Sequence, residues 1–271
     1  KSYYQQALEI EPNNPAVLNN LAVIAMHEDD FNTAKSCLDR ALKLKSNYSD
    51  AYFNLALVAA REDNFDLAER YFLACTSYDP TFASAFDQLG QIKQQGNQLK
   101  EAQSYYEQAH ELLPDHPDIL HRLASVGALL GDANSETLYQ RVLAIDPNHL
   151  ETLHNLASLH YERKSLDAAL QYWLKCVEIE PSATLFYNIG CVYFDKTYHK
   201  EALIYFEKSC QMDPRPIAAL NNIATIHLKE HNHEAALAAY TSLPELDPNH
   251  ATARHLNAAL CAQSPPPATP P

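Results

Sequence analysis

The chain of 271 residues is poor in several residue types, and each shortage argues against a class of protein. It has only 5 glycines and one tryptophan, and it carries 20 lysines and arginines against 34 aspartates and glutamates. Its apolar runs are far shorter than the roughly 20 residues that a membrane-spanning helix needs. The net charge of −14 disfavours nucleic acid, because phosphates are bound by clustered lysine and arginine. We therefore expect neither a nucleic-acid nor a membrane partner.

Motifs for catalysis and metal binding are also missing. The sequence has no glycine-rich phosphate loop, no nucleophile elbow and no distinctive pair of carboxylates. Its six cysteines show no CxxC or zinc-type spacing. Thirteen histidines include one close group, His227, His231 and His233, which matches no known ligand signature. We predict no catalytic residue, no metal and no cofactor in this stretch of chain.

The cysteines favour a reducing environment. Cys75 and Cys176 fall at positions that alanine fills elsewhere in the chain, which indicates buried, reduced thiols. Such thiols are typical of proteins in a reducing compartment, so we expect a cytoplasmic location. Since the chain begins at Lys1 rather than at a methionine, we also expect it to be a piece of a longer protein.

A helix-stopping signal recurs along the chain at nearly constant spacing. The signals lie 33 or 34 residues apart, at Pro12, Ser46, Pro80, Pro114, Pro147, Pro181, Pro214 and Pro248. A fixed period in this range indicates one supersecondary unit copied along the chain. Such a unit buries its apolar face only against its neighbours, which predicts a stack of repeats.

Small and large residues keep the same register in each unit. Small residues recur in the first predicted helix of each unit, at Ala22, Ala56, Gly90, Ala124, Ala157, Gly190 and Ala224. Large apolar residues precede them at a fixed offset, as in FDQLG at 86–90. Close helix packing requires this alternation. The pattern, together with EAQSYYEQA at 101–109 and Pro114, resembles the tetratricopeptide repeat (TPR) family. This resemblance implies an all-α fold, a right-handed α-solenoid or superhelix of helix-turn-helix repeats.

The stops divide the chain into predicted segments. Residues 1–14 are expected to hold the second helix of a truncated repeat. Seven full repeats are expected within 15–250, at 15–48, 49–82, 83–116, 117–149, 150–182, 183–216 and 217–250. Residues 251–263 are predicted to form a capping helix and 264–271 a proline-rich linker or tail.

Amide side chains recur at one position of the first helix. This position, the amide row, holds Asn20, Asn54, Gln88, Arg122, Asn155, Asn188 and Asn222. The arrangement resembles the repeats of O-GlcNAc transferases, and first helices line the inner, concave surface in this family. The resemblance therefore implies a groove in which carboxamides bind the backbone of an extended peptide or a partner helix. The alternative is that these amides hydrogen-bond within the array.

The residues directly before the amide row form a second row. This preceding row holds Asn19, Phe53, Asp87, His121, His154, Tyr187 and Asn221. Of these, Asp87, His121, His154 and Tyr187 are candidate groove residues, as is Asp50 toward one rim. Family members that bind a C-terminal carboxylate need lysine or arginine at several inner positions. The lysines are missing here, so we expect a neutral or basic protein or peptide partner.

Two further functions stay open at this stage. The segment after Pro248 resembles the junction in bacterial TPR proteins where a methyltransferase domain follows the array. It favours an alternative function as the substrate-recognition arm of a larger methyltransferase or glycosyltransferase, with the catalytic domain beyond Pro271. Self-association through the terminal helices is the other possibility, because a truncated array exposes apolar faces.

Overall fold

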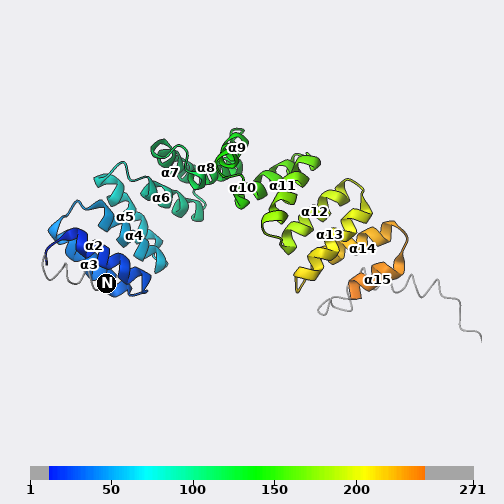
Figure 1. Ribbon diagram of the computed structural model, residues 1–271, viewed down its shortest axis with the longest axis horizontal. Coiled ribbons are helices and arrows are strands. Elements are labelled where there is room, and N and C mark those ends of the chain that lie inside the picture. Colours follow the sequence, from blue (N-terminus) through cyan, green and yellow to red (C-terminus); the bar gives the residue numbers. More distant parts are fainter. Residues whose placement is uncertain (1–11, 242–271) are drawn as a thin grey trace, which may run out of the picture. The chain divides into compact units, whose positions relative to one another are not determined.

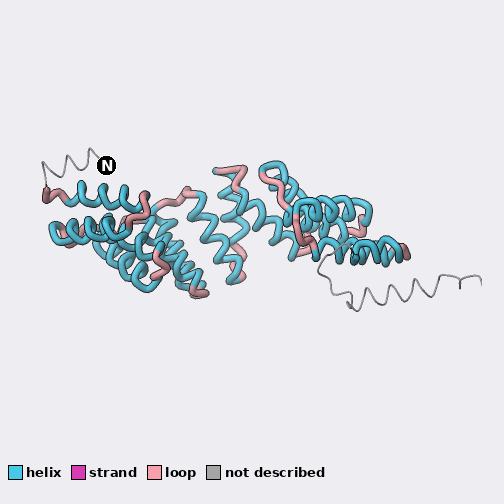
Figure 2. Tube along the Cα trace, turned by 90° about the horizontal axis from the view of Figure 1, so that it is seen from below, coloured by secondary structure: helices cyan, strands magenta, loops and turns pink. Residues whose placement is uncertain are grey.

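In a computed structural model, the described residues, 12–241, form only helices and their connections (Figures 1 and 2). The predicted all-α fold is confirmed over this range. The chain divides into two compact units between Pro147 and Asn148. No helix among the described residues is long and apolar enough to cross a membrane.

The first unit is a stack of four helix pairs, α2/α3, α4/α5, α6/α7 and α8/α9. Within each pair the two helices pack along each other, and the second helix of one pair packs on the first helix of the next. The bounds are α2 Pro15–His27, α3 Phe31–Leu44, α4 Ser49–Arg61, α5 Phe65–Tyr78, α6 Ala83–Gln95, α7 Leu99–Leu112, α8 Pro117–Leu130 and α9 Ser135–Ile145.

The second unit repeats this arrangement with three pairs, α10/α11, α12/α13 and α14/α15. The bounds are α10 Leu150–Glu162, α11 Leu166–Ile179, α12 Ala183–Asp195, α13 His199–Met212, α14 Ile217–Lys229 and α15 His233–Thr241. We keep the predicted repeat ranges as labels for the pairs. The predicted helix of 1–14 lies largely outside the described residues, and the predicted capping helix 251–263 and tail 264–271 lie entirely outside them.

The turns inside the pairs end the first helix in the same way, although the turn between α8 and α9 is one residue longer than the others. One residue of each turn adopts a positive φ, at Asp29, Asp63, Asn97, Gly131, Lys164, Thr197 and His231. The next amide then donates back across the helix end, as from Asn64 N to Ala59 O at 2.9 Å. This bond is the six-to-one bond of a Schellman motif, which satisfies carbonyls that the helix end leaves unpaired. The turn thus ends the first helix of each pair with its terminal carbonyls bonded.

Thr197 is the residue least suited to this turn. Its φ is 63°, and a branched Cβ is disfavoured at positive φ, whereas asparagine tolerates it. We expect Thr197→Asn to raise the free energy of unfolding by about 0.5–1 kcal/mol. The reciprocal change at the equivalent position, Asn97→Thr, is expected to lower it by a similar amount. Urea denaturation followed by circular dichroism measures both, and a loss of stability in Thr197→Asn contradicts the assignment.

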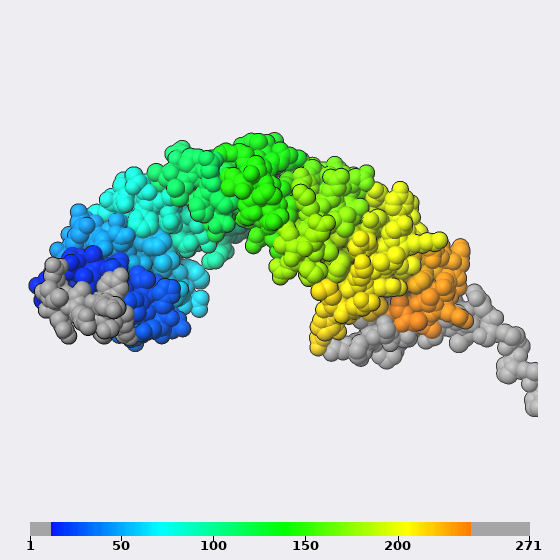
Figure 3. Space-filling model, viewed as in Figure 1, coloured from blue at the N-terminus to red at the C-terminus, as the bar shows by residue number. Residues whose placement is uncertain are grey.

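The core of each unit is built by small residues facing large ones. In the α6/α7 pair, a Cβ placed on Gly90 would lie 2.5 Å from a ring carbon of Tyr106, which is fully buried. Gly190 has the same relation to Phe206 in the α12/α13 pair, at 2.7 Å. Side chains fill the space between neighbouring helices within each unit (Figure 3). The predicted register of small and large residues is therefore the register of the core.

A substitution at Gly90 tests the close approach of this residue to the ring of Tyr106. We expect Gly90→Ala to destabilise the protein by about 1–2 kcal/mol, because overpacking Tyr106 outweighs the higher helix propensity of alanine. Gly96→Ala is the matched control, since the nearest atoms to its added Cβ lie at 3.5 Å or more and its φ is −75°. The control should be neutral or slightly stabilising in thermal denaturation. Equal stability of both variants would show that Tyr106 can move aside at no cost.

Candidate functional site: the first-helix surface

The amide row lies on the first helix of each pair and is only partly accessible. Asn54 on α4 is 9% exposed, whereas the other members are half-buried. Asp50, one turn before Asn54, is exposed. Of the preceding row, Asp87 on α6 is 8% exposed, and His121, His154 and Tyr187 are half-buried. The two rows therefore lie at the boundary between the core and the surface.

Three members of the amide row bond to the preceding row of the pair before them. Asn54 Nδ2 donates to Asn19 Oδ1 at 2.8 Å. Arg122 Nη1 donates to Asp87, and Asn222 Nδ2 donates to the hydroxyl of Tyr187 at 3.4 Å. Each bond joins residues 35 positions apart, so it links two successive repeats. For these three residues the interaction within the array, which the sequence left open, is present.

The link between Arg122 and Asp87 is an ion pair. Arg122 Nη1 lies 2.9 Å from both carboxylate oxygens of Asp87, and Gln91 Nε2 donates to one of them at 2.9 Å. Burial raises the pKa of the Asp87 carboxyl, and the guanidinium opposes that shift. Arginine at this point of the row thus neutralises a nearly buried carboxylate.

Three other members of the amide row have carboxamides that are not hydrogen-bonded within the described residues. Asn20, Gln88 and Asn188 form no hydrogen bond or ion pair with any residue of the described range, 12–241, and all three are half-buried. Each carboxamide offers two N–H donors and one oxygen acceptor. Because the peptide backbone presents the complementary groups, these three positions are able to pair with an extended chain.

Two pockets lie beside the row in the second unit. The first pocket, about 310 Å³, is lined by Leu150, Glu151, His154, Asn155, Glu180, Ser182, Thr184 and Leu185. The second pocket, about 180 Å³, is lined by Ala183, Thr184, Tyr187, Ser209, Asp213, Pro216, Ala218 and Ala219. Their linings correspond one repeat apart, as in the pair His154 and Tyr187, and they share Thr184. The candidate groove residues His154, Asn155 and Tyr187 are thus brought into two equivalent cavities.

The ring side chains of these pockets are uncharged. Burial lowers the pKa of His154 below its ordinary value, so its imidazole is neutral at pH 7. Burial raises the pKa of the Tyr187 hydroxyl, which stays protonated. Asn222 Nδ2 also lies 3.8 Å from the sulfur of Cys191, whose pKa burial raises. Cys191 therefore stays a protonated thiol.

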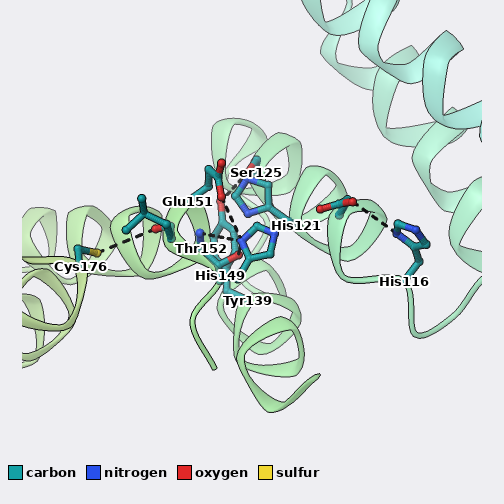
Figure 4. A network of polar contacts seen from close by, with 10 residues as sticks. His116, His121, Ser125, Tyr139, His149, Glu151, Thr152 and Cys176 are labelled. Carbon is teal, nitrogen blue, oxygen red and sulfur yellow. Dashed lines mark hydrogen bonds and ion pairs between the residues drawn. The ribbon is translucent and has the colours of Figure 1, made fainter. Parts of the chain in front are cut away.

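The remaining histidines of this surface serve local structure (Figure 4). In the first unit, the Tyr139 hydroxyl donates to Ser125 Oγ at 3.0 Å, and Ser125 lies 3.4 Å from His121 Nε2. In the second unit, His149 caps α10, where its Nδ1 accepts from the amide of Thr152 at 3.3 Å. No group of three or more His, Cys, Asp or Glu side chains in the described part of the chain is placed to hold a metal ion.

Sequence reasoning missed two parts of this surface. The preceding row was treated as groove lining, although Asn19 and Asp87 act as acceptors for the amide row. Glu180 and Asp213 were not selected, although each lines a pocket. The available signal was their position, since each directly precedes a proline that ends a repeat.

The fold and its rows define a helix-hairpin repeat protein, and comparison with known proteins identifies the family. Family models described as tetratricopeptide repeat match residues 1–55, 49–82, 83–116, 149–179 and 183–216. These matches cover well over half of the sequence. The chain belongs to the tetratricopeptide repeat family. The search of curated proteins found no match.

Solved structures share the fold at low sequence identity. YrrB, described as a TPR protein with an unusual peptide-binding site, has a TM-score of 0.60 at 22% identity, over 71% of this chain and 97% of its own. A TPR protein from Parabacteroides merdae has a TM-score of 0.63 at 14% identity, over 89% and 96%. PilW, a type IV pilus biogenesis factor, has a TM-score of 0.61 at 19% identity, over 72% and 91%. At these identities the likeness concerns the fold.

Substitutions of Asn54 and Asn19 test whether the hydrogen bond between them stabilises the fold. We expect Asn54→Ala to lower the free energy of unfolding by about 1–3 kcal/mol, because the nearly buried Asn19 loses its partner. Asn19→Ala combined with Asn54→Ala should cost less than the sum of the single changes. Gln88→Ala, which breaks no hydrogen bond, should change stability by less than about 0.5 kcal/mol. Additive costs in the double variant, measured by urea denaturation, would contradict the link.

Proposed function

We propose that this protein is an interaction scaffold that binds an extended peptide segment of a partner protein along its first-helix surface. The observation that carries the proposal is the presence of three half-buried carboxamides, Asn20, Gln88 and Asn188, without partners in the described chain. A partly buried polar group is stabilised when it gains a hydrogen bond. The backbone of an extended peptide supplies such bonds at regular intervals and independently of its sequence.

The pockets support the same proposal. Both open beside the rows in the second unit, and cavities of this kind hold side chains that project from a bound backbone. Amides that bind the backbone and pockets that receive side chains are the two components of peptide recognition. YrrB, which shares the fold, is described as having a peptide-binding site, and we extend that class of ligand to this chain by proposal.

Two other hypotheses from the sequence stay predictions. The substrate arm of a methyltransferase or glycosyltransferase depends on a domain beyond Pro271, and peptide binding by the first helices is compatible with it. Self-association depends on terminal helices that lie outside the described residues. No feature of residues 12–241 favours either of them over a scaffold.

The proposal is tested with an array of unstructured peptides of varied charge and composition. We expect the protein to bind a subset of them, and the triple variant Asn20→Ala, Gln88→Ala, Asn188→Ala to bind that subset at least tenfold more weakly. This loss corresponds to one or two hydrogen bonds at about 1 kcal/mol each. The variant should retain its helical content, because the three amides have no partners to lose.

Lys200→Ala, Glu201→Ala, Lys208→Ala is the matched triple control, placed on α13, a second helix. It should bind like the wild type. Amide chemical shifts in NMR spectra locate the bound peptide independently. The proposal fails if no peptide binds, or if the shifted amides belong to second helices.

A further inference from the structure

Both pockets of the second unit combine apolar walls with carboxylates. Leu150 and Leu185 line the first pocket together with Glu151 and Glu180. Alanines, a proline, Thr184, Tyr187 and Ser209 line the second pocket together with Asp213. Glu180 and Asp213 hold the same position in successive repeats, directly before Pro181 and Pro214. A carboxylate beside apolar side chains therefore occurs twice, one repeat apart, although the second pocket is the more polar of the two.

No cation of the described chain neutralises these carboxylates. No lysine or arginine among residues 12–241 forms an ion pair with Glu151, Glu180 or Asp213. His149 Nδ1 lies 3.5 Å from Glu151 and also accepts a hydrogen bond from the Thr152 amide at the start of α10. The nearby imidazole of His154 is held neutral by burial, which lowers its pKa. The pockets are therefore negatively charged.

We infer that the two pockets bind lysine or arginine side chains of the partner's extended segment, one basic side chain in each pocket. Lysine and arginine carry a long aliphatic stem below a charged head. In the first pocket the stem lies along Leu150 and Leu185, and the head reaches Glu180. In the second pocket the head reaches Asp213. This inference rests on the proposed peptide binding and names the chemistry of the partner.

The two pockets are adjacent, since they belong to successive repeats and Thr184 lines both. In a polyproline II segment, residues i and i+3 project from one face about 9 Å apart. In a β-strand, residues i and i+2 lie about 7 Å apart and i and i+4 about 13 Å apart. Two basic residues three positions apart in a polyproline II segment, both on one face, are the register that belongs to the proposal.

Electrostatics over longer distances favour the same partner. The chain has a net charge of −14, which attracts cationic segments and repels anionic ones before contact. This general attraction does not distinguish the pockets from the rest of the surface. A test must therefore compare variants that remove equal charge from different places.

The test measures fluorescence anisotropy with three labelled, proline-rich peptides and the whole 271-residue chain. One peptide carries two lysines three positions apart, the second carries them two positions apart, and the third carries glutamates in place of the lysines of the first. We expect the first to bind at least threefold more tightly than the second, and the third to show no binding. The variant Glu180→Gln, Asp213→Asn should weaken binding of the first peptide about fivefold or more, the effect of two exposed ion pairs.

Glu201→Gln, Glu207→Gln is the matched control, because it removes the same charge from exposed positions on α13. It should bind the first peptide nearly as the wild type does. Equal weakening in both variants would overturn the pockets as the basic sites. Equal binding of the first two peptides would overturn the register. If the array experiment yields only neutral or acidic binders, peptide binding stands and this inference fails; if it yields none, both fail.

Discussion

A pair of short helices cannot bury its own apolar face, and the rest of this structure depends on that constraint. Each pair is stabilised by the next, so the residues at the contact must match in every repeat. Within a pair the two helices are matched by volume, as where Gly90 leaves room for the ring of Tyr106 and Gly190 for that of Phe206. A residue with positive φ recurs in every turn inside a pair, where it ends the first helix.

Stacking also divides the amide row between two roles. Residues of the amide row come close to the preceding row of the repeat before them, so a side chain there can bond to that neighbour. Asn54, Arg122 and Asn222 take the first role, and Asn20, Gln88 and Asn188 have no partner within the described chain. The same row thus contributes both to stability and to the surface proposed for binding.

Part of the negative charge of the molecule lies in the two pockets of the second unit. A net charge of −14 by itself indicates only solubility and a general attraction for cations. The pockets concentrate part of that charge beside apolar walls, where Glu180 and Asp213 have no cationic partner within residues 12–241. Such sites suit amphipathic, basic side chains better than small ions or acidic groups. In the first unit, by contrast, Arg122 neutralises Asp87 within the stack.

The sequence by itself determined the fold, because the period of its prolines and small residues reflects packing that every repeat shares, and the all-α, TPR interpretation is confirmed. It also located the amide row, since equivalent positions share a helix face. Only the tertiary structure decided which amides are already bonded. Those bonds join residues 35 apart, one position away from strict equivalence, so comparing repeats did not show them. The tertiary structure was also needed to find the pockets, because each is assembled from two first helices and the loop between repeats, and the second also from Ser209 of α13. The order of residues does not define the distances between these parts.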